Sequence, residues 1–347
     1  MYKLAQALEV RNTECVGLLS DKLLDSSVTL GIELEVEGLG RYNADVLPLG
    51  VDASGDLKLG YLNYWTPIKD GSLRGQWATE FISGASIGKI KIPLRGEQVI
   101  RALKEIDQFF QAMTFLSKPP KYSSRTSVHV HMDVTELTNE ELYRVVLLTA
   151  IFEKLLYKFA GEGRWESNYC VPMALNSVGI NQLFQIKATS FDSGLRSLIR
   201  NEELQKYEGL NLRPILTQGT IEYRQLEGTA DMTRVLDWIN IILAIRKAAI
   251  KYKNINIDNL MPWISQEGLD NIGRDVFGVL FEKLNYPGAN ADILEGIRVA
   301  QDIEFHTPYL TPGNQRELLN LPNLKVSNLV KYAKFNRIKP NNVIEED

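Results

Sequence analysis

The chain has 347 residues and a formal net charge of −4, with 39 lysines and arginines against 43 aspartates and glutamates. Apolar residues make up 44% and charged residues 24%, as in an ordinary soluble globular protein. No basic block marks a nucleic-acid-binding surface, no apolar run approaches a membrane span, and the first residues lack the order of a secretory signal. Cys15 and Cys170 are too few for a disulfide scaffold. We therefore expect a cytoplasmic protein with reduced cysteines that binds neither nucleic acid nor membrane.

The elements can be predicted in chain order. We expect a short helical lead-in over residues 1–27, and alternating aliphatic and polar residues predict a strand over Val28–Gly38. Apolar residues at helical spacing then predict helices over Gly96–Met113, Glu140–Ala160 and Thr233–Lys251, the second preceded by a capping-box sequence. These elements indicate an α+β fold.

After Asn254 the predicted helices become shorter and are separated by prolines. We therefore expect a main domain over residues 1–255 and a C-terminal helical appendage over residues 256–347.

Two of the three histidines lie in one predicted strand, Ser127–Asp133. Because side chains alternate along a strand, His129 and His131 share one face at a spacing of about 7 Å. A single histidine is usually a satisfied core residue, but two on one face of a histidine-poor chain favour metal or anion binding.

Acidic residues occupy three other predicted strands: Glu33 and Glu35 at i, i+2, Glu80 in an apolar run, and Glu222 two residues before Arg224. If these strands share one sheet with the histidines, the acids repel one another unless cations lie among them. We interpret the pattern as a divalent-metal site. Two simpler readings stay open: a solvated sheet edge for the first pair, and a structural salt bridge between Glu222 and Arg224.

The ligand types narrow the choice of metal. Several carboxylates with one or two imidazoles suit Mg²⁺, with Mn²⁺ as the alternative, and Mg²⁺ is often shared with substrate phosphates. The cysteines lack zinc-site spacing, and the third histidine, His306, fits a surface loop. The chain has no P-loop, so any ATP would have to be held by metals and arginines.

The order of the motifs resembles the amidoligase family, a branch of the glutamine synthetase and glutamate–cysteine ligase superfamily of carboxylate–amine ligases. The similarity extends from about Val28 to about Lys251, although Ser127-Val128 stands where the family often has Gly. The motifs that carry it are Gly31-Ile32-Glu33-Leu34-Glu35, Lys69-Asp70-Gly71-Ser72-Leu73, Thr79-Glu80-Phe81-Ile82-Ser83, Val128-His129-Val130-His131, Lys206-Tyr207-Glu208-Gly209-Leu210-Asn211-Leu212, and Thr220-Ile221-Glu222-Tyr223-Arg224 with Gly228-Thr229.

This resemblance implies a glutamine synthetase-like catalytic domain, in which a curved, mainly antiparallel sheet holds the site and helices cover its outer face. It also implies a reaction: ATP phosphorylates a substrate carboxylate, and an amine attacks the acyl phosphate to give an amide. The variable segment Gly161–Arg200 could then exclude water from the acyl phosphate.

The resemblance also implies residue roles. Arg224 and Glu222 would be catalytic, with Asp70 as a further candidate near the amine or the nucleotide. His131, Arg213 and Asn211 would contact nucleotide or substrate. The metal ligands would be Glu33, Glu35, Glu80, His129 and Glu222.

The expected substrates are small-molecule or peptide carboxylates and amines. A glutamine amidotransferase-like partner is also implied, because many such proteins are encoded beside one in bacterial and phage genomes. Two other functions are compatible with the motifs: a metal-dependent hydrolase or oxygenase using the His-x-His and an acid, and a degenerate ligase fold that serves as a structural or binding protein. The presence of all candidate ligands together argues against the second.

Overall fold

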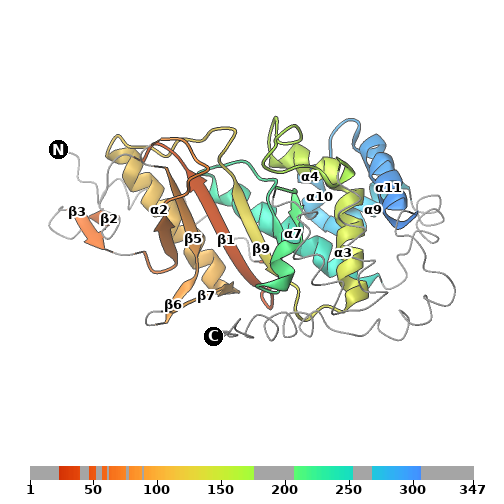
Figure 1. Cartoon of the computed structure of the whole chain (residues 1–347), viewed down its shortest axis with the longest axis horizontal. Helices are drawn as coiled ribbons and strands as arrows, with labels where there is room; N and C mark the ends of the chain where they lie inside the picture. The colour runs from red at the N-terminus through yellow and green to blue at the C-terminus, as the bar shows by residue number, and fades with distance from the viewer. Residues whose placement is uncertain are drawn as a thin grey trace, which may run out of the picture.

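The structure is a computed structural model that describes residues 23–39, 47–51, 57–60, 62–75, 78–87, 90–175, 207–252 and 268–305. It is a mixed α/β arrangement of an open, mainly antiparallel sheet and helices (Figure 1). The main sheet contains β1 (Thr29–Val36), β4 (Trp65–Ile68), β5 (Thr79–Ser83), β8 (Leu94–Arg95), β9 (Val128–Asp133), β10 (Leu210–Asn211) and β11 (Thr220–Tyr223). Two separate hairpins are formed by β2 (Leu47–Val51) with β3 (Leu57–Gly60), and by β6 (Ala85–Ile87) with β7 (Ile90–Ile92).

The main sheet runs in the order β10-β11-β9-β1-β5-β4, and β8 also pairs with β1. The four segments that carry the candidate acids and histidines are therefore neighbours, as the metal-site interpretation requires. Strand β1 alternates as predicted: its aliphatic side chains are buried and belong to the hydrophobic core. Glu33 and Glu35 consequently lie on the opposite face.

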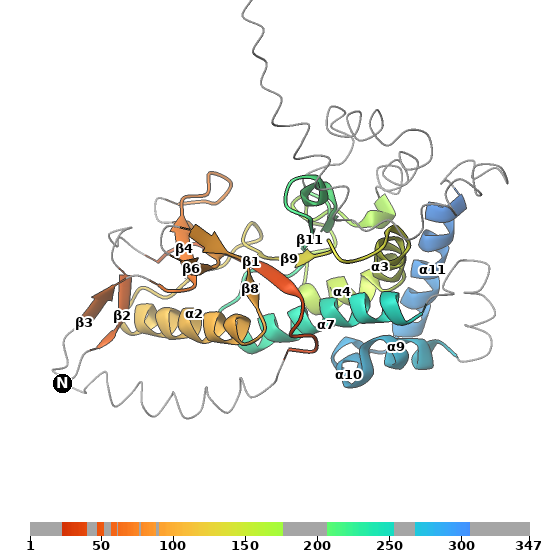
Figure 2. The same ribbon diagram turned by 90° about the horizontal axis from the view of Figure 1, so that it is seen from below.

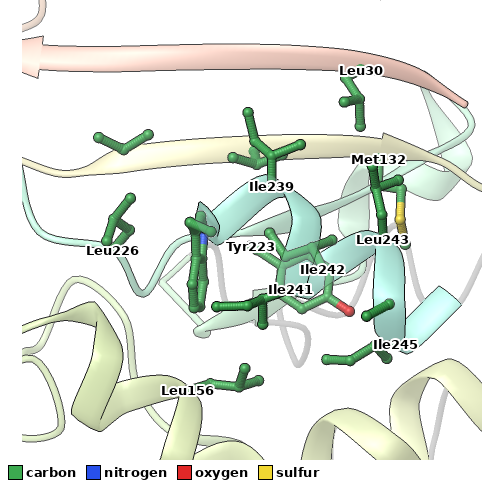
Figure 3. Packing of buried hydrophobic residues seen from close by; sticks show 14 of the residues in the cluster. Leu30, Met132, Leu156, Tyr223, Leu226, Ile239, Ile241, Ile242, Leu243 and Ile245 are labelled. Atoms are coloured by element: carbon green, nitrogen blue, oxygen red, sulfur yellow. The ribbon is translucent and has the colours of Figure 1, made fainter. Parts of the chain in front are cut away.

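Helices α2 (Glu97–Phe115) and α7 (Met232–Lys251) lie along one side of the sheet, and both confirm predicted helices (Figure 2). Helix α7 is buried almost all round, because α2, α3 and α9 pack against it and its Trp238 contacts Tyr223 of β11 and Phe159 of α4. Figure 3 shows Ile239 of α7 beside the strands and Leu156 of α4 across from it. One face of the sheet is thus sealed by helices.

The predicted helix Glu140–Ala160 is interrupted in the structure. It consists of α3 (Asn139–Ile151) and α4 (Glu153–Ala160), which meet at Phe152 with φ −99° and ψ 8°. The ring of Phe152 is fully buried and packs edge-on against Phe277, with ring centroids 4.8 Å apart. This distant contact has no signal in the local periodicity, whereas the predicted capping box is confirmed at Thr138 and Glu141.

Helices α9 (Leu269–Phe277), α10 (Phe281–Leu284) and α11 (Ala289–Phe305) pack against α3, α4 and α7 and share one hydrophobic cluster with the sheet. Helix α11 lies so close to the end of α3 that a Cβ added at Gly296 would come within 2.0 Å of the Ile151 carbonyl oxygen. Short 3₁₀ turns lie at Met173–Leu175, Arg213–Leu216 and Gly278–Leu280.

Several predictions concern segments outside the described residues. These are the lead-in helix up to residue 22 with Cys15, most of the variable segment Gly161–Arg200, the predicted boundary at residue 255, and His306. Cys170 is described and is a buried free thiol. Among the described helices, none combines the length and apolar character needed to cross a membrane.

Candidate active site

The candidate ligands lie on the sheet face opposite helices α2 and α7, and the strand register aligns them. The ladder places the polar side chains in direct opposition across five strands: Asn211 with Glu222, Glu222 with His131, His129 with Glu33, and Glu35 with Glu80. Residues directly opposite each other in an antiparallel pair point to the same face and lie close together. The register therefore assembles one continuous polar cluster.

Both histidines contact the same two glutamates. His129 Nδ1 is 3.1 Å from Glu33 Oε2 and 3.4 Å from Glu222 Oε1. His131 Nε2 is 3.3 Å from Glu33 Oε1 and 3.9 Å from Glu222 Oε1, while its Nδ1 lies 3.1 Å from Thr220 Oγ1. The two imidazoles thus present different ring nitrogens to one pair of carboxylates.

Glu222 is the most heavily contacted acid of the cluster. Its Oε1 accepts a hydrogen bond from Arg224 Nη1, and its Oε2 accepts one from Asn211 Nδ2 at 2.6 Å. Arg224 also directs Nε toward the carbonyl oxygen of Tyr169 at 3.5 Å. The same-face salt bridge that the sequence left open is therefore present, inside the cluster rather than apart from it.

A second arginine holds the backbone that carries Arg224. The buried guanidinium of Arg164 donates from Nη2 to the carbonyl oxygen of Arg224 at 2.8 Å and from Nε to that of Gln225 at 2.6 Å. The backbone N–H of Arg224 donates to the carbonyl oxygen of Gly209 at 2.8 Å. These bonds place the segment that leaves β11, and with it the Arg224 side chain.

Glu35 and Glu80 form the other end of the cluster. Glu35 is buried, and its Oε2 accepts hydrogen bonds from Ser127 Oγ at 2.5 Å and Ser127 N at 2.8 Å. Ser127 Oγ also lies 2.7 Å from His129 Nε2. Glu35 and Glu80 are direct cross-strand partners of like charge, an arrangement that destabilises a sheet unless a proton or a cation lies between them.

Within the described part of the chain, two groups of three side chains have the spacing of metal ligands. Glu33, His129 and Glu222 offer one ligand atom each, all within 4.8 Å of one another, and so do Glu35, Glu80 and His129. The two groups share His129. Carboxylate oxygens with a single imidazole nitrogen suit Mg²⁺ or Mn²⁺.

The charges and burial within the cluster shift the pKa values of its acids in opposite directions. Burial alone would raise the pKa of Glu33, but hydrogen bonds and charge from His129 and His131 outweigh it and hold this pKa well below its usual range. Burial, reinforced by the charges of Glu33, Glu35 and Asp70, raises the pKa of Glu80 to about 8. Burial opposes protonation of His131, yet Glu33 and Glu222 raise its pKa. A cluster that retains an extra proton near neutral pH is one that a cation fits.

Two predicted residues lie outside this set of contacts. Asp70 accepts hydrogen bonds from Ser72 N at 2.7 Å and Ser72 Oγ at 2.8 Å, as expected for a turn residue. Among the described residues, its link to the cluster is the effect of its charge on Glu80. Arg213 is exposed, and the contact described between it and the cluster is its backbone N–H to Asn211 Oδ1 at 3.0 Å.

Three residues of the site were not assigned roles from sequence: Ser127, Thr220 and Arg164. Ser127 and Thr220 stand two positions before His129 and Glu222, so strand alternation could have placed them on the same face. Arg164 carries no such signal, because its partners are carbonyl oxygens about 60 residues further along the chain.

The fold and site define a mixed α/β protein whose antiparallel sheet presents acids and histidines in metal-binding positions. Residues 99–246 match the family described as "Putative amidoligase enzyme", and the resemblance to that family is confirmed over this segment. The segment contains His129, His131, Glu222 and Arg224, while β1 and β5 supply the remaining acids from outside it. A comparison with curated proteins gives no match.

Proposed function

We propose that the protein is an ATP- and Mg²⁺-dependent carboxylate–amine ligase with a glutamine synthetase-like catalytic fold. The observation that carries the proposal is the convergence of Glu33, His129 and Glu222, with ligand atoms within 4.8 Å of one another, beside Arg224. Three of these four residues lie inside the segment that matches the amidoligase family. The family match supports an enzyme that forms carbon–nitrogen bonds.

The proposed reaction has two steps. A substrate carboxylate oxygen attacks the γ-phosphorus of ATP, which breaks the bond to the β-phosphate oxygen and releases ADP. An amine nitrogen then attacks the acyl phosphate, loses a proton, and expels inorganic phosphate to leave an amide. Both steps develop charge on phosphate oxygens, so the protein must supply fixed positive charge and exclude water.

The residues present fit a bound divalent cation. Glu33, His129 and Glu222 would hold one cation, and Glu35 with Glu80 would contribute to a second position. Bound Mg²⁺, or Mn²⁺ in its place, supplies neutralisation of the phosphate charge. The carboxylates are anchored before any ligand arrives, because Asn211 holds Glu222 and Ser127 holds Glu35.

Arg224 and His131 are the groups placed to meet phosphate. Arg224 donates from Nη1 to Glu222 and from Nε to the carbonyl oxygen of Tyr169. Its Nη2 takes part in none of the described contacts, and we propose that it donates to the transferring phosphate. His131 points Nε2 into the cluster and is held from behind by Thr220. Asn211, Arg213 and Asp70 are proposed as secondary contacts to nucleotide or substrate.

The proposed location, substrates and partners are those that the sequence indicates. We propose a cytoplasmic protein, of bacterial or phage type, that acts on small-molecule or peptide carboxylates and amines. A glutamine amidotransferase-like partner could supply the amine. Nucleic acid and membranes are not expected as partners, since the chain has a net charge of −4 and no basic block.

The hydrolase or oxygenase alternative is less well supported by the geometry. A facial triad of the oxygenase type needs two histidines and one carboxylate. Each of the two groups with ligand spacing in the described part of the chain has one histidine and two carboxylates. The degenerate-scaffold alternative is disfavoured because a buried like-charge cluster costs stability and a scaffold gains nothing from it.

Hydroxylamine provides a general test, because it attacks acyl phosphates and leaves a hydroxamate that gives a coloured complex with ferric iron. The protein with Mg²⁺ and ATP should form hydroxamate with some member of a panel of amino acids, dicarboxylates and short peptides. Phosphate release should require both ATP and that carboxylate. Glu222→Gln is the control, and it should form hydroxamate more slowly by about 100-fold or more.

Ligand-induced stabilisation tests the nucleotide site without knowledge of the substrate. Saturating Mg²⁺ with a non-hydrolysable ATP analogue should raise the melting temperature, as any ligand that binds only the native state does. A melting curve that does not move would overturn the proposal and favour the scaffold alternative.

A further inference from the structure

Ser127 connects the two groups of candidate ligands. It precedes β9 by one residue, is 2% exposed, and lies between two buried side chains. Its hydroxyl oxygen is 2.5 Å from Glu35 Oε2 and 2.7 Å from His129 Nε2. One hydroxyl therefore contacts the acid of one group and the histidine that both groups share.

The number of hydrogens available determines which atom donates in each hydrogen bond between Glu35, Ser127 and His129. Glu35 Oε2 also accepts the backbone N–H of Ser127 at 2.8 Å, so two donors converge on one carboxylate oxygen. A serine hydroxyl has one hydrogen to give, and here it goes to Glu35. What the hydroxyl presents to His129 is then a lone pair, and Nε2 must carry the hydrogen that this lone pair accepts.

We propose that Ser127 is a positioning residue that keeps the proton of His129 on Nε2, so that Nδ1 carries the lone pair available to a metal. Nδ1 is the nitrogen that faces Glu33 at 3.1 Å and Glu222 at 3.4 Å. This inference deepens the proposed function and rests on it, because it concerns the metal that the ligase would use. Hydrogen bonds from outer residues commonly fix a ligating histidine in this way.

The consequence is that the two groups cannot share His129 equally. The group of Glu33 and Glu222 receives its nitrogen, while the group of Glu35 and Glu80 is left with oxygen ligands alone. Glu35 is anchored through Oε2, which leaves Oε1 to face a cation. We therefore expect two unlike positions: one mixed nitrogen–oxygen site that favours Mn²⁺ over Mg²⁺, and one all-oxygen site without that preference.

Nitrogen NMR on protein labelled with ¹⁵N-histidine reads the proton position directly. The chain has three histidines, so the spectrum is simple, and loss of one ring system in His129→Gln assigns the signals. In the Mg²⁺-saturated protein, His129 should show a protonated Nε2 and an unprotonated Nδ1. A protonated Nδ1 with a bare Nε2 would overturn the proposal.

Titration with Mn²⁺ tests whether Ser127 affects the affinity of the site for metal. Ser127→Ala should weaken the tighter Mn²⁺ site by about tenfold, the scale found for outer-shell residues of metal sites. The control is Ser83→Ala: Ser83 Oγ accepts a hydrogen bond from Ile32 N at 2.6 Å, and strand alternation places Ser83 on the face opposite Glu80. This variant should lose stability yet bind Mn²⁺ as the wild type does.

The outcomes separate this inference from the proposed function. Wild-type Mn²⁺ affinity in Ser127→Ala would overturn the positioning role, and it would leave the ligase assignment standing if the same preparation still formed hydroxamate. Equal weakening in Ser127→Ala and Ser83→Ala would also overturn it, because the loss would then follow general destabilisation.

Discussion

Glu33 and Glu153 are both largely removed from water, but their surroundings differ. Glu33, on the sheet face opposite α2 and α7, lies beside two imidazoles, and their hydrogen bonds and charge lower its pKa in spite of burial. Glu153, in the first turn of α4, accepts hydrogen bonds from Met173 N at 2.7 Å and Ala174 N at 3.2 Å. Burial, with a further contribution from the charge of Glu208, raises the pKa of Glu153 to about 7.

The difference shows how to separate a candidate metal ligand from a structural acid. A buried carboxylate beside histidines stays ionised and offers lone pairs to a cation. At Glu153 burial raises the pKa more than the two backbone N–H donors lower it, so this carboxyl is driven toward its neutral form and serves the fold. Burial of an acid by itself therefore does not indicate function. The following predictions test this contrast.

Replacing Glu222 with Gln should have the largest effect. The change keeps the shape but removes the charge that the cation and Arg224 contact, so ATP-dependent turnover should fall on the order of 100-fold or more. Hydroxamate formation measures it, and circular dichroism should show an unchanged fold. Glu153→Gln is the matched control, expected to retain turnover, and wild-type-like turnover in Glu222→Gln would contradict the metal role.

Glu153→Gln should instead change the pH dependence of stability. The folded-state pKa of about 7 exceeds the ordinary 4.5, so the folded protein binds more protons between these values. The free energy of unfolding of the wild type should therefore fall, relative to the variant, by about 3 kcal/mol as pH rises from about 4.5 to 7, and then level off. Urea denaturation at several pH values measures this, and a constant difference between the two proteins would refute it.

His131→Ala should weaken nucleotide binding by about tenfold while changing Mn²⁺ affinity less, since we place His131 opposite phosphate and His129 on the metal. Isothermal titration calorimetry with Mn²⁺ alone and then with an ATP analogue separates the two effects. If Mn²⁺ binding suffered more than nucleotide binding, the roles of the two histidines would be exchanged.

Asp70→Asn should have the smallest effect. The amide oxygen can still accept from Ser72 N, so we expect a stability loss of about 1 kcal/mol or less and turnover within about threefold of wild type. Thermal melting and the hydroxamate assay measure these quantities. A tenfold loss of turnover would instead support the contact to amine or nucleotide that the sequence motif implies.

Strand and helix patterns were predictable because their signals are local. Alternation in Val28–Gly38 placed Glu33 and Glu35 on one face, and the His-x-His spacing did the same for His129 and His131. The capping box and the long apolar helix before Lys251 were equally clear. The family resemblance added the order of the motifs, which local patterns could not supply.

What could not be predicted depends on register and on distant contacts. Nothing local indicates that Glu35 lies opposite Glu80, or that Glu222 contacts both histidines. The interruption falls at Phe152, whose ring packs on Phe277, more than 100 residues away in sequence. The contact between Ser127 and Glu35 can be recognised only when the pairing of β1 with β9 is known. Asp70 and Arg213 were chosen by motif position, which does not report where their side chains lie.

The position of Arg164 has a consequence for the whole molecule. Its guanidinium reaches the carbonyl oxygens of Arg224 and Gln225 from the turn directly after α4, the helix against which α10 and α11 pack. A shift of the carboxy-terminal helices would therefore be transmitted through α4 to Arg224, the arginine that we propose meets phosphate. Partners or truncations acting at that distant end could thus change turnover without touching the metal ligands.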